Sequence, residues 1–301
     1  MRVTVAGIEF ANPVIAASGT FGYGIEFDDI VTLEKLGGLV TKGLSRAPMS
    51  GNPAPRIIET SGGMMNAIGL QNVGVAAFIE KKLPPLQKRP GVKVIANVFG
   101  STVADYLAVI ESLNNADGVV AYELNVSCPN TAHGGIVFGT DPEALAELTR
   151  CAREHSTRPI IVKLSPNVTS IARMARIAED AGAHAISLVN TFVSLAIDVE
   201  TRKPRIANIT GGLSGPAIKP IAVRMVWEAS RAVRIPIIGM GGIMNAEDAV
   251  EFMLAGASAV QVGTASYADP RAAENIAEGL RHWCQRHGVD RVADLTGKLE
   301  I

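Results

Sequence analysis

Residues 235–243, Ile235-Pro236-Ile237-Ile238-Gly239-Met240-Gly241-Gly242-Ile243, form a short apolar run that leads directly into a glycine-rich turn. A helical pattern follows over Ala246–Ala255, and the next apolar run, Ala259–Val262, leads into Gly263 and Thr264. Short runs that are apolar on both faces are typical of parallel strands covered by helices. This stretch therefore predicts one strand–helix–strand unit of an α/β fold.

The same unit recurs along the chain, because six earlier apolar runs alternate with segments whose apolar residues are spaced by three and four. Eight strands separated by helices predict a (β/α)8 TIM barrel, which closes the sheet without an edge. No linker rich in Pro, Gly and Ser divides the chain, so we expect residues 1–301 to form a single domain. The predicted strands are Val14–Ala17, Gly38–Lys42, Val92–Val98, Gly118–Leu124, Pro159–Leu164, Ala185–Val189, Ile235–Gly239 and Ala259–Val262.

The helical segments carry recognisable start signals. A side chain that accepts a hydrogen bond commonly precedes the first turn, and Pro is favoured at the first helical position. Asp141, Ser170 and Asn245 are expected to cap three of the helices on this basis. The predicted helices are Val103–Leu113, Pro142–Glu154, Ile171–Ala181, Ala217–Val233 and Ala246–Ala255.

Two stretches do not fit the repeat. Gly43–Asn72 follows the second predicted strand and Thr191–Gly215 follows the sixth, and both are expected to be structureless insertions. Barrel enzymes build their active sites at the carboxyl ends of the strands, and long loops there are usually lids or binding loops. We therefore expect active-site insertions after strands 2 and 6.

The composition excludes several classes of protein. The net charge is −1 and no basic tract occurs, which argues against nucleic acid or an anionic membrane as the main partner. The three cysteines, Cys128, Cys151 and Cys284, show no C-x-x-C spacing, so neither a disulfide framework nor a metal or iron–sulfur site is expected in this chain. No signal peptide and no apolar run of membrane-spanning length is present, which favours a cytoplasmic location.

The glycines after the last two predicted strands indicate a phosphate site. Gly241, Gly242 and Gly263 allow backbone N–H groups to approach an anion, and a following helix start adds positive potential. Loops after the seventh and eighth strands are the usual phosphate site of this barrel. A dinucleotide fingerprint is disfavoured because Met244 occupies the third glycine position. Tight turns that bind no ligand are the other interpretation.

Polar side chains follow several other predicted strands. Lys42 and Lys163 close apolar strands, where an ammonium group favours an anion at the barrel mouth, although a lysine can also extend to the surface. Several amides could together bind a flat heteroaromatic ring with alternating donors and acceptors, while any one alone is more often a cap or turn residue. The asparagines in question are Asn66, Asn97, Asn125, Asn130 and Asn190.

Cys128 stands out among the cysteines. Pro129 ends the strand before it and directs it into a loop with Gly134 and Gly135, whereas Cys151 and Cys284 lie in helical patterns and are expected to be buried. A thiol with a pKa of about 8.5 can serve as a general base near neutral pH. Apart from His133, no histidine lies near it in the sequence, so a general base is favoured over a nucleophile.

Five motifs occur in order along almost the whole chain: Asn66-Ala67-Ile68-Gly69-Leu70-Gln71-Asn72, Asn125-Val126-Ser127-Cys128-Pro129-Asn130, Lys163-Leu164-Ser165-Pro166-Asn167, Gly212-Leu213-Ser214-Gly215-Pro216 and Gly241-Gly242-Ile243 with Gly263-Thr264. This set resembles the class 1 dihydroorotate dehydrogenases. That family is a barrel that binds flavin mononucleotide (FMN) and oxidises dihydroorotate to orotate in pyrimidine synthesis. The membrane-associated class 2 enzymes use serine as the base, so Cys128 argues against class 2.

The resemblance implies a role for each residue. Cys128 would remove the C5 proton while hydride leaves C6 for flavin N5, and Lys163 would lie near the flavin N1/O2 edge, where a cation stabilises the anionic reduced ring. Thr191 stands where the family often has serine. Substrate would be bound by Lys42, Asn66, Gly69, Leu70, Asn125, Asn130, Asn190 and Thr191. FMN would be bound by Ala17, Ser18, Lys42, Asn97, Asn125, Lys163, Val189 and Gly215, with Gly241, Gly242, Gly263 and Thr264 around its phosphate.

The residues of the motifs at Lys163–Asn167 and Gly212–Pro216 most resemble those of class 1B. This subclass pairs the barrel with an electron-transfer subunit that carries FAD and a [2Fe–2S] cluster and reduces NAD, which implies a heterotetramer of two subunits of each kind. The alternatives are a fumarate-dependent class 1A homodimer and a related flavin enzyme that reduces pyrimidine bases. A non-redox phosphate-binding isomerase or aldolase explains the glycines but gives no role to Cys128, and a non-enzymatic scaffold is a further alternative.

Overall fold

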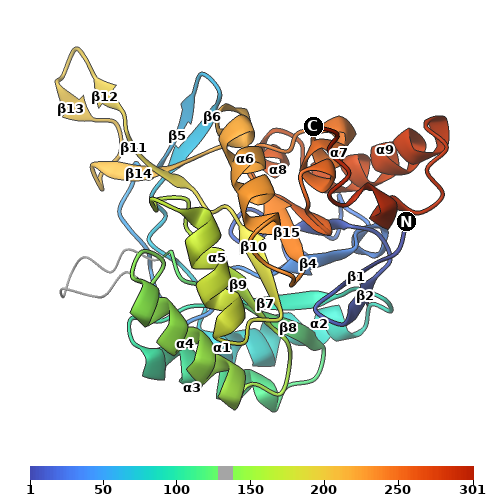
Figure 1. The fold of residues 1–301 in the computed structure, drawn as a ribbon. Coiled ribbons are helices and arrows are strands. Elements are labelled where there is room, and N and C mark those ends of the chain that lie inside the picture. The colour runs from blue at the N-terminus through green and yellow to red at the C-terminus, as the bar shows by residue number, and fades with distance from the viewer. Residues whose placement is uncertain (128–137) are drawn as a thin grey trace.

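The structure, a computed structural model, describes residues 1–127 and 138–301. Eight parallel strands form a closed barrel, and the last of them pairs with the first (Figure 1). The prediction of a (β/α)8 barrel is therefore confirmed, and the predicted strand ends differ from the observed ones by at most two residues. The barrel strands are β3 Val14–Ala16, β4 Gly38–Val40, β7 Val94–Val98, β8 Val119–Asn125, β9 Ile160–Lys163, β10 Ala185–Leu188, β15 Ile237–Met240 and β16 Ala259–Val262.

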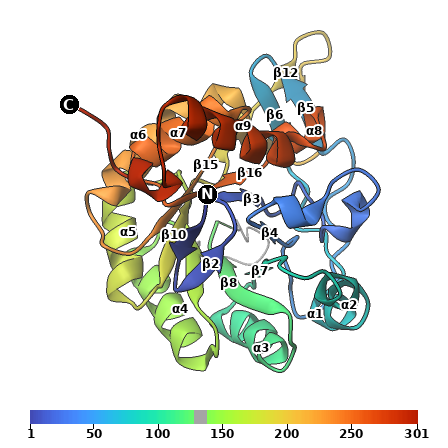
Figure 2. The same cartoon turned by 90° about the vertical axis from the view of Figure 1, so that its right-hand side faces the viewer.

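Helices surround the barrel (Figure 2). The link after β3 contains two short 3-10 helices, η1 Ile25–Phe27 and η2 Leu33–Lys35, where the ideal repeat has an α-helix. The other helical elements are α1 Val75–Ala77, the π-helical turn η3 Phe78–Lys82, α2 Leu83–Gln87, α3 Val103–Asn114, α4 Pro142–His155, α5 Ile171–Asp180, η4 Pro216–Ile218, α6 Lys219–Ser230, α7 Ala246–Leu254, α8 Ala265–Ala268, α9 Ala272–Arg286 and η5 Val292–Leu295.

The predicted helix caps are confirmed. The side chain of Asp141 accepts hydrogen bonds from the first turn of α4, Ser170 does so for α5, and Asn245 does so for α7. Each cap satisfies a backbone N–H that has no partner within its own helix. Local sequence therefore fixes where these three helices begin.

The two insertions are not structureless, so that expectation is wrong. The first contains β5 Ile57–Thr60 and β6 Gly63–Asn66, and the second contains β11 Phe192–Leu195, β12 Ile197–Asp198, β13 Lys203–Pro204 and β14 Thr210–Ser214. Four of these strands form one antiparallel sheet in the order β11-β14-β6-β5. Within each insertion neighbouring strands pair, β5 with β6 and β11 with β14, and the pairing of β6 with β14 joins the two insertions.

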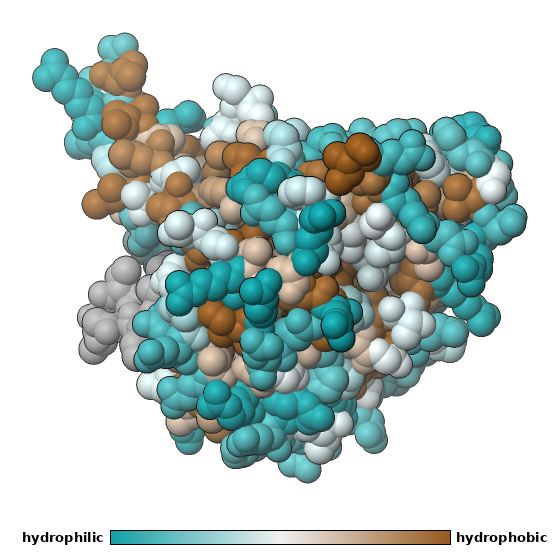
Figure 3. Space-filling model, in the orientation of Figure 1, coloured by the Kyte–Doolittle hydropathy of each residue, from teal (hydrophilic) through white to brown (hydrophobic). Residues whose placement is uncertain are grey.

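The two ends of the barrel are covered differently. The hairpin of β1 Val3–Val5 and β2 Ile8–Phe10 lies over the amino end, with Val5 and Phe10 fully buried (Figure 2). At the other end an arm that carries β12 and β13 projects from the insertion sheet (Figure 1). Apolar side chains gather on the surface around this arm (Figure 3). Val193 in β11 and Val199, between β12 and β13, are exposed. The insertion sheet therefore lies outside the barrel core.

Among the described residues, none of the helices combines the length and the apolar character needed to span a membrane.

Candidate active site

The predicted site residues meet at the carboxyl end of the barrel. Parallel strands place their carboxyl ends at one edge, which is where barrel enzymes carry their chemistry. Cys128 and Asn130 lie outside the described residues. Of the others, Ala17 and Ser18 follow β3, Lys42 follows β4, Asn97 lies in β7, Asn125 ends β8, Lys163 ends β9, Val189, Asn190 and Thr191 follow β10, Gly241 and Gly242 follow β15, and Gly263 and Thr264 follow β16.

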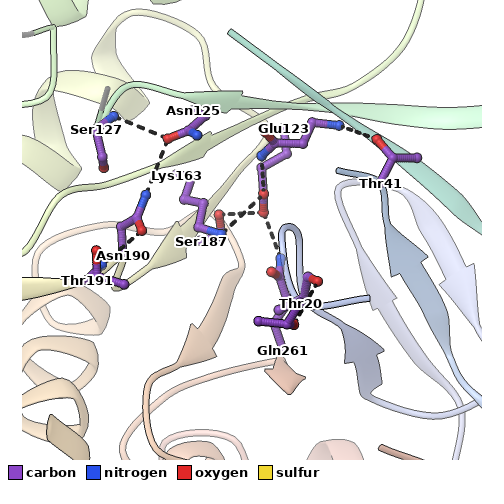
Figure 4. Close-up of polar contacts among 12 residues, drawn as sticks. Thr20, Thr41, Glu123, Asn125, Ser127, Lys163, Ser187, Asn190, Thr191 and Gln261 are labelled. Carbon is purple, nitrogen blue, oxygen red and sulfur yellow. Dashed lines mark hydrogen bonds and ion pairs between the residues drawn. The ribbon is translucent and has the colours of Figure 1, made fainter. Parts of the chain in front are cut away.

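Two amides from different strands contact each other at this edge (Figure 4). The Asn190 side-chain NH2 donates to Asn125 Oδ1 over 3.3 Å, and the Thr191 backbone N–H donates to Asn190 Oδ1 over 2.9 Å. Asn125 is anchored further, because the hydroxyl of Tyr106 donates to its backbone carbonyl over 2.7 Å. The expected convergence of asparagines is thus found for Asn125 and Asn190, and their amides are held in defined orientations.

The insertion sheet brings Asn66 into the same neighbourhood. Its side-chain NH2 donates to the carbonyl of Gly212 over 3.4 Å, where β6 pairs with β14. A Cβ on Gly212 would lie 2.0 Å from Thr191 Oγ1, so the Thr191 side chain packs against this glycine. Gly69 and Leu70 follow in left-handed conformations, with φ of 73° and 57°. The pairing of the two insertions therefore links Asn66 to Thr191 through one glycine.

Lys42 has an altered acidity. Burial lowers the pKa of its ammonium group, and the positive charge of Arg56 lowers that pKa further. Both effects disfavour the charged form, and an anion close to the ammonium group would oppose them. This environment suits the binding of a negatively charged group beside Lys42.

Lys163 belongs to a network around Glu123 that the sequence did not predict (Figure 4), and Asn97 belongs to it as well. The fully buried carboxylate of Glu123 accepts from Asn97 Nδ2 over 2.8 Å and lies 3.7 Å from Lys163 Nζ. Ser187 and Gln261 donate to its other oxygen, over 2.9 and 2.7 Å. One feature of the sequence could have predicted this network: a glutamate stands inside the apolar run Gly118–Leu124, and a buried charge needs hydrogen-bond or ionic partners.

The glycine loops after three strands lie in close contact. A Cβ on Gly242 would lie 2.7 Å from the carbonyl oxygen of Gly215, and Gly215 has a φ of 97°. The hydroxyl of Thr264 donates to Ser214 Oγ over 2.8 Å, which joins the loop after β16 to the same place. The three loops therefore meet at Gly215, Gly242 and Thr264. The space around the two glycines is too small for a larger side chain.

A capping box precedes α7 in the loop after Gly242. The backbone N–H groups of Met244 and Asn245 donate to the Asp248 carboxylate over 2.8 and 3.2 Å. Because a side chain of the helix itself already caps these groups, the glycine loops are the better candidates for binding an anion.

Comparison with known proteins agrees with this geometry. The family model for dihydroorotate dehydrogenase matches residues 1–283. A protein of Pelobacter propionicus named dihydroorotate dehydrogenase B (NAD(+)), catalytic subunit, is 58% identical over 300 residues, covering 100% of this chain and 98% of its own. One of the same name from Citrifermentans bemidjiense is 56% identical, with coverage of 100% and 98%. A Solibacter usitatus protein, provisionally named dihydroorotate dehydrogenase A (fumarate), is 57% identical, with coverage of 100% and 99%.

The matched regions of these relatives cover this chain from end to end, the barrel strands and both insertions included. A family model that spans nearly the whole chain, together with full-length relatives that share more than half of their residues with it, establishes that this chain belongs to the dihydroorotate dehydrogenase family.

Proposed function

We propose that this chain oxidises (S)-dihydroorotate to orotate in de novo pyrimidine (UMP) biosynthesis, with FMN as its bound cofactor. The observation that carries the proposal is the contact between Asn125 and Asn190 at the carboxyl end of the barrel, in a member of this family. Amides fixed in this way match a planar ring that carries alternating N–H and C=O groups. A phosphate-binding isomerase would leave this pair without a role.

The described residues fit FMN. Asn97 Oδ1 and Gln261 Oε1 are buried and have no hydrogen-bond partner among the described residues, which suits a ligand that carries an N–H group. When bound, FMN supplies the group that accepts hydride. We assign its binding to Ala17, Ser18, Lys42, Asn97, Asn125, Lys163, Val189 and Gly215, with Gly241, Gly242, Gly263 and Thr264 around the phosphate.

The substrate would lie against the mouth formed by β8, β10 and the insertion sheet. Asn125 and Asn190 would bind its ring, and the lowered pKa of Lys42 makes the ammonium group responsive to the substrate carboxylate. Each of these groups has a definite position because a neighbouring strand or loop holds it. The full set assigned to the substrate is Lys42, Asn66, Gly69, Leu70, Asn125, Asn130, Asn190 and Thr191.

Cys128 is assigned as the general base. It follows β8 by three residues in sequence, and Asn125, which is assigned to the substrate, is the last residue of that strand. Its thiolate would take the proton from C5 of the substrate, the carbon next to the one that loses hydride. A nucleophilic role is disfavoured because the sequence around Cys128 offers no relay apart from His133.

We further propose that the electrons pass to NAD through a partner subunit that carries FAD and a [2Fe–2S] cluster, in a cytoplasmic assembly of two catalytic and two electron-transfer subunits. Support comes from relatives that are named as NAD-dependent catalytic subunits. The fumarate-dependent alternative has its own support in the name of the Solibacter relative. Because the chain is about equally identical to relatives named for NAD and to one named for fumarate, the preferred electron acceptor is the property that distinguishes the two alternatives.

The test is acceptor preference of the purified chain, with and without a co-expressed electron-transfer subunit. We expect the purified chain to be yellow and its flavin to be reduced by dihydroorotate. The reduced chain should transfer electrons to NAD only when the partner subunit is present. Efficient turnover of the isolated chain with fumarate would assign class 1A instead. Faster reaction with uracil or thymine than with dihydroorotate would point to a pyrimidine-base reductase.

A further inference from the structure

A carboxylate lies inside the barrel at a position where apolar packing is usual. Glu123 is fully buried in β8, and Ser187 in β10 and Gln261 in β16 bind the same carboxylate oxygen (Figure 4). These residues come from the fourth, sixth and eighth barrel strands, and alternate strands fill one layer of such a barrel. Branched apolar residues normally occupy these layers, so a charged layer needs a reason.

The charge of Glu123 determines how two amides are turned. An ionised carboxylate only accepts hydrogen bonds, so Asn97 and Gln261 must both direct their NH2 groups toward it. Their carbonyl oxygens must then point away from Glu123. Both oxygens are buried and have no partner within residues 1–127 and 138–301. The carboxylate therefore creates two oriented acceptors.

Lys163 completes the arrangement. Its side chain is 7% exposed and its Nζ lies 3.7 Å from the Glu123 carboxylate, at the end of β9. The ion pair defines where the ammonium group lies and places a negative charge close to it. Two acceptors and one neutralised cation thus depend on the same side chain.

We propose that Glu123 is a positioning residue for the flavin site, which turns Asn97 and Gln261 so that their oxygens accept from the cofactor and which holds Lys163 in place. Gln261 thereby becomes a further cofactor-binding residue. The inference rests on the proposed function, because it takes FMN as the ligand of this end of the barrel. Glu123 itself acts only through its neighbours.

The decisive variant is Glu123→Gln. Glutamine offers one carbonyl oxygen and one NH2 group, so either Asn97 or Gln261 must turn its oxygen inward and present a donor to the ligand. Such a mismatch weakens a buried hydrogen bond enough to lower FMN affinity about tenfold. Loss of the negative charge beside Lys163 should also favour the anionic reduced ring and shift the reduction potential of bound FMN to more positive values.

The measurements are fluorescence titration of the apo chain with FMN and spectroelectrochemistry of the loaded chain. Glu179→Gln is the matched control, because it removes one negative charge from a carboxylate in α5 that binds the backbone N–H groups of Arg234 and Ile235. We expect this control to keep the wild-type affinity and potential. A folded Glu123→Gln chain with wild-type affinity and potential overturns the proposal.

A second variant decides the matter if Glu123→Gln does not fold. Gln261→Met removes the buried Oε1 of Gln261 together with the Nε2 that donates to Glu123, but it keeps the Glu123 carboxylate and its ion pair with Lys163. FMN should therefore bind more weakly, while its potential changes little because the charges around it are unchanged. Wild-type FMN affinity of this variant overturns the assignment of Gln261. A wild-type chain that binds no FMN contradicts the proposed function and this inference together, whereas unchanged variants of a yellow wild-type chain contradict the inference alone.

Discussion

Cys128 is the residue on which the chemistry depends at the scale of single side chains. We expect Cys128→Ala to bind FMN normally and to lose reduction of the flavin by dihydroorotate by a factor of about 10²–10⁴, the usual contribution of a general base. Anaerobic stopped-flow absorbance of the flavin measures this rate. Cys284→Ala, which alters a buried thiol in α9, is the control. A variant at position 128 that keeps nearly all of its rate at neutral pH would exclude the base.

Lys42 predicts a pH dependence with a definite sign. Its pKa is lowered from 10.5 mainly by burial, so the unfolded chain binds more protons between that lowered pKa and 10.5. Its contribution to the free energy of unfolding should therefore rise with pH across this window. Affinity for the orotate carboxylate should instead fall as pH rises through the lowered pKa, because the ammonium group loses its charge.

Orotate titrations that follow the flavin spectrum from about pH 7 to about pH 10 would reveal this fall. Lys42→Met should bind orotate more weakly and show a flatter profile. Lys35→Met, at an exposed lysine in η2 that pairs with Glu274, is the control and should keep the wild-type profile. Equal slopes for wild type and Lys42→Met would remove Lys42 from the explanation.

At the scale of elements, two reasons for glycine in the loop after β15 can be measured separately: its backbone conformation and its close contact with a neighbouring loop. Gly242 has a φ of 84°, and a Cβ there would lie 2.7 Å from the Gly215 carbonyl oxygen. Gly288 has a φ of 65° but no atom within 4 Å of such a Cβ. The free energy of unfolding of Gly242→Ala should therefore fall by about 1 kcal/mol for the left-handed conformation and by a further ~1–3 kcal/mol for crowding. For Gly288→Ala it should fall only by the first amount.

Urea unfolding and FMN titration of both variants test this prediction. FMN affinity should fall for Gly242→Ala and remain at the wild-type value for Gly288→Ala. Similar stability losses in the two variants would show that backbone conformation, and not contact between the loops, makes glycine necessary after β15.

At the scale of the whole molecule, the projecting arm should be dispensable for the barrel. Replacing Ile197–Pro204 by Asn-Gly between Ala196 and Arg205 removes strands whose residues are exposed, so the free energy of unfolding should change by less than about 1 kcal/mol. Gly212→Ala in β14, which belongs to the neighbouring four-stranded sheet, should act differently, because its Cβ would press on Thr191. Calorimetry with orotate would show weaker binding only for the glycine variant. Loss of FMN from the shortened chain would mean that the arm supports the barrel.

Features that depend on residues close together in the sequence could be predicted, whereas features that depend on distant residues could not. The cap of α4 by Asp141 is set by residues within one helical turn and was predicted to the residue. Asn66, by contrast, lies on the same glycine as Thr191, Gly212, only because β6 pairs with β14, and nothing near either strand in sequence indicates its partner. The network of Glu123 was missed for the same reason, since Gln261 lies 138 residues away from it in the chain.

The sequence by itself determined the strand–helix repeat, the helix starts and the presence of polar residues after the strands, because periodicity, caps and glycines act over a few residues. It also determined the family, through motifs kept in order along the chain. Only the tertiary structure decided that the insertions form one sheet and that Glu123 holds Asn97, Gln261 and Lys163. Barrel closure is responsible, because it brings distant strands into hydrogen-bond contact.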